Sequence, residues 1–77
     1  MEIHLQLYSI LREKLPAESN GQTILQIKEN ASLADLLEKL DITRRVVISV
    51  NDNHESDMSR QLQNGDKVKI FSSVSGG

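Results

Sequence analysis

The sequence predicts an α+β domain in which one main helix packs on one face of a mixed sheet of four to five strands. Apolar and polar residues alternate near the beginning of the chain and again over residues 67–71, which is the period of strands buried on one face. Residues 32–40 instead repeat their leucines at helical spacing. The chain has 77 residues, so these elements are expected to share one core.

The N-terminal third is expected to form two antiparallel strands joined by a bulky connection. Residues 3–8 alternate between apolar and other side chains and indicate the first strand. A short helical segment is expected over residues 10–15, because Pro16 disfavours its continuation. Residues 17–21 have the composition of a turn. The second strand is expected over residues 23–27.

The main helix has the clearest local signals. Ser32 lies three residues before Asp35, which is close to the pattern of a capping box at a helix start. Such a short helix is not stable by itself, so it must pack on the sheet. The residues of its apolar stripe are Leu33, Leu36, Leu37 and Leu40.

Two further strands are expected in the C-terminal half. Residues 46–50 are mostly β-branched and indicate the third strand, and a turn follows at 51–54. Residues 55–63 are expected to be irregular, with Met58 and Leu62 directed into the core. A strong turn signal at 64–66 precedes the last strand at 67–71. This order of elements corresponds to the β-grasp, or ubiquitin-like, architecture.

The whole chain, residues 1–77, is expected to be one domain with a flexible C-terminal tail at 72–77. Val68 and Ile70 are predicted to point into the core, so Phe71 should point to the opposite face of the sheet. The alternative is that Phe71 closes the core, because strand parity shifts easily by one residue.

Composition argues against several functional classes. The chain has no cysteine, which excludes disulfides, thiolate metal sites and a cysteine nucleophile. A net charge of −2 and only two aromatic residues, Tyr8 and Phe71, argue against nucleic-acid binding. Neither a signal peptide nor an apolar run of about 20 residues is visible. We therefore expect a cytoplasmic protein without membrane contact.

Two segments carry a resemblance to a known family. The first is Val50-Asn51 followed by Leu62-x-x-Gly65-Asp66-x-Val68-x-x-Phe71-x-x-Val74-x-Gly76-Gly77. It resembles the sulfur-carrier family of ubiquitin-like proteins (MoaD/ThiS-like). The second segment is Leu7-Tyr8-Ser9-Ile10-Leu11-Arg12-Glu13. It is similar to the start of the small subunit of molybdopterin synthase, although Ser72-Ser73 stands where prolines are common in that branch.

The resemblance implies a chemical role for the main chain of Gly77. An adenylating, E1-like partner would use ATP to activate Gly77, and a sulfur donor would then displace AMP and leave a thiocarboxylate. The chain would bind no cofactor or metal itself and would be the non-catalytic sulfur-donor subunit of molybdopterin synthase. The large subunit would bind a pterin precursor as the acceptor, in the biosynthesis of the molybdenum cofactor.

Two alternatives remain open at this point. The same carrier chemistry could serve thiamine or another sulfur-transfer pathway. In the other alternative, the chain is a ubiquitin-like modifier whose Gly77 ends in an isopeptide bond to a target lysine.

Partner binding is expected to use an exposed apolar area beside the tail. Tyr8 and Val47 share the outward parity of Phe71. Val74 follows Phe71 in the tail and is expected to lie next to this apolar area. Exposed apolar areas of this kind mark partner sites, and Gly76 would keep the tail slim. His4 and His54 are expected to be solvated. Arg44-Arg45 is expected to be an exposed helix exit, with a docking role as the alternative.

Overall fold

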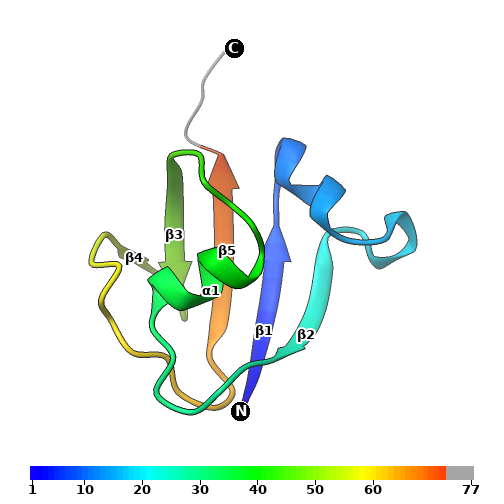
Figure 1. The fold of residues 1–77 in the computed structure, drawn as a ribbon. Coiled ribbons are helices and arrows are strands. Elements are labelled where there is room, and N and C mark those ends of the chain that lie inside the picture. The colour runs from blue at the N-terminus through cyan, green and yellow to red at the C-terminus, as the bar shows by residue number, and fades with distance from the viewer. Residues whose placement is uncertain (73–77) are drawn as a thin grey trace.

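Five strands form one mixed sheet in the computed structural model, which describes residues 1–72 of the chain. The strand order is β2-β1-β5-β3-β4, so β1 and β5 lie side by side at the centre of the sheet (Figure 1). β1 and β5 run parallel, and the other neighbours are antiparallel. The strands are β1 (Glu2–Leu7), β2 (Gln22–Gln26), β3 (Val46–Val50), β4 (Asn53–Glu55) and β5 (Lys67–Ser72). The helical segments are η1 (Ser9–Lys14), η2 (Ala17–Ser19) and α1 (Leu33–Lys39).

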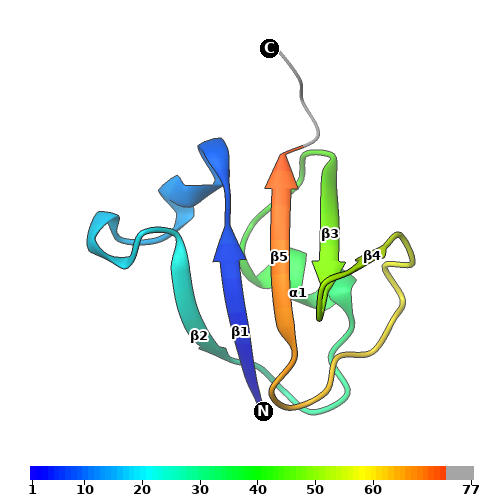
Figure 2. The ribbon, with the colours of Figure 1, turned by 180° about the vertical axis from the view of Figure 1, so that it is seen from behind.

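The main helix, α1, crosses one face of this sheet and leaves the other face open (Figures 1 and 2). The expected capping box is confirmed. The backbone N–H of Asp35 donates to Ser32 Oγ at 3.2 Å, and the backbone N–H of Ser32 donates to Asp35 Oδ2 at 2.9 Å. These bonds satisfy backbone donors at the helix start. Leu33 and Leu36 are fully buried, so the apolar stripe holds α1 on the sheet.

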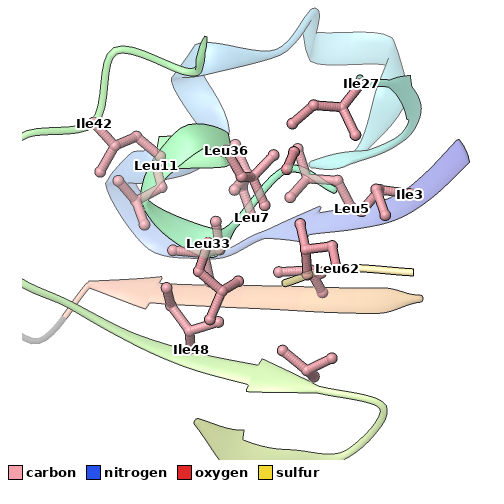
Figure 3. Close-up of a cluster of buried hydrophobic side chains, with 14 residues drawn as sticks. Ile3, Leu5, Leu7, Leu11, Ile27, Leu33, Leu36, Ile42, Ile48 and Leu62 are labelled. Atoms are coloured by element: carbon pink, nitrogen blue, oxygen red, sulfur yellow. The ribbon is translucent and has the colours of Figure 1, made fainter. Parts of the chain in front are cut away.

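The core lies between α1 and the covered face of the sheet (Figure 3). The central strands contribute alternate side chains, because successive residues of a strand point to opposite faces. Val68 and Ile70 of β5 are fully buried, as the sequence predicts. Leu62 is also buried, so the segment before β5 enters the core as expected. The buried apolar residues are Ile3, Leu5, Leu7, Leu11, Ile27, Ala31, Leu33, Leu36, Ile42, Ile48, Val50, Leu62, Val68 and Ile70.

The connection between β1 and β2 contains two 3-10 helical segments, η1 and η2. The helical turns expected over residues 10–15 are therefore present, but in the tighter 3-10 geometry. η1 begins abruptly after β1, because Ser9 has a left-handed backbone with φ of 54°. Leu11 is buried under the sheet's covered face, whereas Ile10 is 50% exposed.

The segment after β3 differs from the sequence prediction. The stretch expected to be a turn and then irregular contains the short strand β4, which pairs antiparallel with β3. Asn51 and Asp52 have positive φ values of 51° and 70°, so they reverse the chain within two residues. Asn51 and Asp52 therefore suffice for the turn that the sequence placed over residues 51–54.

The end of β5 also differs from the prediction. Ser72 was expected to begin the tail 72–77, but it is the last residue of β5 because it pairs with Val46 at the beginning of β3. The other tail residues, among them Val74, Gly76 and Gly77, lie outside the described residues.

At the beginning of β5, two residues of the C-terminal motif form a hydrogen-bonded clasp. Asn51 Nδ2 donates to Asp66 Oδ1 at 3.0 Å, and the backbone N–H of Lys67 donates to Asn51 Oδ1 at 3.0 Å. Asp66 is 7% exposed, and its other carboxylate oxygen accepts from the backbone N–H of Gln63 at 2.9 Å. This Asn51–Asp66 clasp joins the turn after β3 to the turn before β5, so we assign these motif residues to folding.

Candidate functional site

Three apolar side chains of the open sheet face gather where β5 ends. Phe71 pairs directly with Val47 of β3, and directly opposed residues of neighbouring strands share a face. The ring of Tyr8 stacks on the ring of Phe71, with centroids 4.3 Å apart and planes 13° apart. We call Tyr8, Val47 and Phe71 the sheet-face patch. The sequence predicted this grouping from strand parity, and its role in partner binding stays a prediction.

The parallel pairing of β1 with β5 positions the two rings. Leu7 pairs with Ile70, and both of these side chains are buried on the helix side. The next residue of each strand, Tyr8 and Phe71, therefore points to the open face. The backbone N–H of Tyr8 donates to the carbonyl oxygen of Ile70 at 3.2 Å and extends the ladder by one residue. Because β1 and β5 are parallel neighbours, their carboxyl ends lie at the same end of the sheet. Tyr8, which follows β1, therefore lies beside Phe71 near the end of β5.

Phe71 is half-buried and is not part of the buried core, so the alternative in which it closes the core is wrong. Its partly covered surface is in contact with Tyr8, and a stacked aromatic pair contributes roughly 0.5–1.5 kcal/mol beyond its buried area. Val47 is 40% exposed. The sheet-face patch is thus a preformed apolar surface that still has area to bury against a partner.

A polar border lies beside the patch on the same face. Lys69 of β5 pairs with Gln6 of β1 on one side and with Ser49 of β3 on the other. Lys69 Nζ also forms an ion pair with Asp52 Oδ1 at 3.3 Å. Lys69 belongs to no motif in the sequence, although its position between the inward residues Val68 and Ile70 places it on the open face.

The titratable groups with shifted pKa values belong to local caps and ion pairs. The backbone hydrogen bond from Ser32 lowers the pKa of Asp35. The side-chain hydrogen bond from Arg60 lowers the pKa of Glu55, and the two groups lie 2.9 Å apart. The Ser59 hydroxyl lowers the pKa of Asp57. All three carboxylates lie outside the sheet-face patch, and we assign them to structure.

Other residues considered from the sequence lie apart from the patch. His4 and His54 are exposed, as expected. Arg44 is exposed and lines an open hollow of about 390 Å³ together with Ile10 and Asp41. Within residues 1–72, no three His, Asp or Glu side chains are grouped closely enough to hold a metal ion. No helix of this described part is long and apolar enough to span a bilayer.

The proposed chemical group itself, the carboxylate of Gly77, lies outside the described residues, as do Val74 and Gly76. The last described residue before that segment is Ser72, at the end of β5. Ser72 pairs with Val46, and its neighbour Phe71 belongs to the sheet-face patch. Ser72 therefore lies next to the patch, at the end of the sheet where β1 and β5 both stop (Figure 2).

Comparison with protein families gives one match that spans nearly the whole chain. The model of the ThiS family matches residues 5–77. The match therefore includes β1 from its fourth residue, the sheet-face patch and the terminal glycines. No curated protein sequence matches this chain.

Three solved structures share the fold at low sequence identity. SAMP1 from Haloferax volcanii is 15% identical, with 100% of both chains covered and a TM-score of 0.73. A protein assigned as molybdopterin converting factor subunit 1 from Pyrococcus furiosus is 19% identical, with 96% of this chain and 99% of that chain covered and a TM-score of 0.75. A chain in the complex of subunits 1 and 2 of the molybdopterin-converting factor from Helicobacter pylori 26695 is 17% identical, with 100% of both chains covered and a TM-score of 0.67. These likenesses establish the β-grasp fold.

Proposed function

Because this chain belongs to the ThiS family of ubiquitin-like sulfur carriers, we propose that it carries sulfur as a thiocarboxylate on the C-terminal carboxyl group of Gly77. The observation that carries this proposal is the family match over residues 5–77, which extends through Gly76 and Gly77. The composition is in accord with it. The chain has no cysteine, so sulfur must be held by a group other than a side-chain thiol.

The chemistry takes place at the main-chain carboxylate of Gly77. A carboxylate oxygen attacks the α-phosphorus of ATP, and pyrophosphate leaves with the electrons of the broken P–O bond. Hydrosulfide then attacks the carbonyl carbon of the acyl-adenylate. The C–O bond to AMP breaks, AMP leaves as a phosphate anion, and the proton of hydrosulfide is released to water. The product is the thiocarboxylate, and no oxidant or reductant is required.

Glycine suits this position for steric reasons. Gly76 and Gly77 have no Cβ, so they accept backbone angles that other residues avoid and fit a narrow channel in a partner enzyme. Ordering them costs roughly 1–2 kcal/mol per residue. An interface between the folded domain and the partner enzyme must offset that cost. The sheet-face patch of Tyr8, Val47 and Phe71 is the surface that we propose for this interface.

We propose the large subunit of a molybdopterin synthase as the partner and a pterin precursor as the acceptor. The support is the similarity of the segment from Leu7 to Glu13 to the small subunit of that enzyme, together with the shared fold of a chain from a complex of subunits 1 and 2 of the molybdopterin-converting factor. In this role the chain supplies the sulfur atom, and the partner supplies the catalytic side chains. The thiocarboxylate sulfur would bond to an acceptor carbon as an oxygen group of the acceptor leaves that carbon with its bonding electrons. Water would then hydrolyse the resulting thioester, which leaves the sulfur on the acceptor as a thiol and returns the carboxylate of Gly77.

The proposal is tested by reconstitution with an adenylating enzyme, ATP and sulfide. Intact-mass spectrometry should show that one oxygen of the protein is replaced by sulfur. Deletion of Gly77 should abolish the exchange, and so should an alanine appended after Gly77, which leaves the glycine in place but removes its free carboxylate. Both variants should keep the melting temperature of the parent. Sulfur incorporation into the appended variant would contradict the proposal.

A second candidate function is protein modification. The observation that favours it is the shared fold of a structure described as small archaeal modifier protein 1 from Haloferax volcanii. A modifier also needs an activated Gly77, but a lysine amine rather than hydrosulfide attacks the carbonyl. The patch argues for the carrier, because an apolar docking surface suits a stable noncovalent complex with one dedicated partner. A carrier for thiamine or another sulfur-transfer pathway would use the same Gly77 chemistry with a different acceptor.

A further inference from the structure

The edge strand β2 lacks the usual protection of a sheet edge. It lies at one end of the strand order, and Figures 1 and 2 show no strand beyond it. Its sequence, Gln-Thr-Ile-Leu-Gln over Gln22–Gln26, contains no charge and no proline, whereas edge strands normally carry charges, prolines or bulges that prevent pairing with other chains. Ile24 at its centre is 55% exposed and is the most exposed large hydrophobic residue of the described part.

The bonding between β1 and β2 determines which backbone groups face outward. The N–H of Leu7 donates to the carbonyl oxygen of Gly21 at 2.7 Å, and the N–H of Ile27 donates to that of Met1 at 3.0 Å. In an antiparallel ladder the bonded pairs alternate, so the odd-numbered residues of β2 bond to β1. The even-numbered residues direct their N–H and C=O groups to the outer edge. These residues are Gln22, Ile24 and Gln26.

We propose that β2 is a self-association edge, at which two copies of this chain pair antiparallel about a two-fold axis that passes beside Ile24. In this register each Ile24 faces the Ile24 of the second copy, and Gln22 faces the Gln26 of the second copy. All of these residues have outward backbone groups, so each facing pair exchanges both of its N–H···O=C bonds. The two five-stranded sheets become one continuous sheet.

The near-palindromic sequence of β2 is the reason for a second copy as the occupant. Antiparallel pairing about Ile24 places a glutamine opposite a glutamine on both sides of the axis, and side-chain amides both donate and accept. Gln26 Nε2 already donates to Glu2 Oε1 at 3.4 Å on this face, so its side chain lies along the sheet. Further out, Lys28 comes opposite Asn20 of the second copy. The register therefore opposes no like charges, which would be destabilising across strands.

The proposed pairing is compatible with, and independent of, the sulfur-carrier function. The sheet-face patch is built on β1, β5 and β3, and the outer edge of β2 is separated from β5 by β1. In both copies the patch and Ser72 of β5 would thus lie away from the paired edge. Five residues per chain form a small interface, so the dimer should be weak and should exchange rapidly.

Sedimentation velocity over a concentration series that reaches the millimolar range tests the pairing. The parent chain should show reversible monomer–dimer behaviour. Ile24→Lys places two lysines at the axis and should weaken self-association roughly ten-fold or more. Ile24→Glu should do the same, and an equal mixture of the two variants should associate again, because opposite charges then meet at the axis. Ile10→Lys is the matched control: Ile10 is similarly exposed at 50% but lies on η1, so its substitution should leave association unchanged.

Hydrogen exchange identifies the edge independently of the variants. The N–H groups of Gln22, Ile24 and Gln26 should exchange fast in dilute protein and slow down as the concentration rises. Those of Thr23 and Leu25 bond to β1 and should be protected at every concentration. A parent chain that stays monomeric over the whole series would overturn the proposal. Dimerisation that Ile24→Lys leaves intact, or that slows exchange at Tyr8 and Phe71 instead of β2, would overturn it as well.

Discussion

The aromatic ring of Tyr8 stacks on that of Phe71 at a centroid distance of 4.3 Å, although the two residues come from opposite ends of the described chain. Tyr8 follows the first strand, and Phe71 precedes the last described residue. The contact exists because β1 and β5 are parallel neighbours that end at the same edge of the sheet. The sheet-face patch therefore lies beside Ser72, the last described residue before the segment that contains Gly77.

The patch predicts that Phe71→Ala impairs binding more than folding. The substitution removes the ring that stacks on Tyr8, so affinity for the large subunit should fall by more than about 1 kcal/mol if Phe71 is a hot spot. The free domain should lose much less than the roughly 3–5 kcal/mol typical of a buried Phe. Calorimetric titration and urea unfolding measure the two effects. Ile70→Ala is the control, because Ile70 is fully buried and its truncation should mainly destabilise the fold.

Carrier and modifier functions predict different products in the native host. A carrier is regenerated after each transfer, so tagged protein should co-purify with one larger subunit and return to its own mass on a denaturing gel. A modifier should instead accumulate on lysines of other proteins. A ladder of adducts that survives denaturant and reducing agent, and that disappears on deletion of Gly77, would favour the modifier.

The Asn51–Asp66 clasp predicts a stability effect without an effect on chemistry. Asn51→Ala removes the donor to Asp66 Oδ1 and the acceptor for the N–H of Lys67. Asp66 is 7% exposed, so the loss of the partner of its Oδ1 at this largely buried position costs about 1–3 kcal/mol. The bond from Lys67 is exposed and adds little, because water can replace it. Urea unfolding should show this loss, while sulfur loading of the folded fraction stays at the parent level. A loss of loading in fully folded Asn51→Ala protein would assign the clasp a functional role.

Two glycines with positive φ provide a matched pair of substitutions. Gly21 has φ of 77°, and a Cβ there would lie 2.6 Å from the carbonyl oxygen of Leu7. Gly65 has φ of 87°, but a Cβ there would meet nothing within 4 Å. Gly65→Ala should therefore cost only the backbone strain, roughly 1–2 kcal/mol. Gly21→Ala carries a steric clash in addition and should lower the melting temperature more. Equal shifts of the two variants would contradict this account.

The capping box predicts a contribution to stability that is lost in acid. The pKa of Asp35 is lowered from its ordinary value of 3.8, chiefly by the backbone hydrogen bond from Ser32. A lowered pKa means that the folded state favours the ionised carboxylate. Its contribution is therefore fully present above about pH 3.8 and disappears as the pH falls through the folded-state pKa.

Melting temperatures of the parent and of Asp35→Asn over a pH series test this sign. The variant should be less stable at neutral pH, and the difference should shrink toward the acid end of the series. Glu38→Gln, at an exposed position of the same helix, serves as the control and should follow the parent closely. A difference between parent and Asp35→Asn that grows in acid would contradict the assigned role.

The sequence by itself determined the features that depend on local spacing. The capping box of Ser32 and Asp35 follows from two residues three positions apart, and the outward parity of Phe71 follows from the alternation along one strand. A period of two or of 3.6 residues is a property of a single element. For this reason α1, the strands β1, β2, β3 and β5, and the members of the sheet-face patch could be predicted before any pairing was known, whereas the short strand β4 was not.

Only the tertiary structure decided how those elements meet. The parallel contact of β1 with β5, the stacking of Tyr8 on Phe71, the pairing of Ser72 with Val46 and the Asn51–Asp66 clasp all join residues that are distant in the sequence. Strand partners are selected by the packing of the whole core, and the spacing within one strand contains no information about its neighbour. The same holds for the free edge of β2, which becomes an edge only because β1 takes β5 as its second partner.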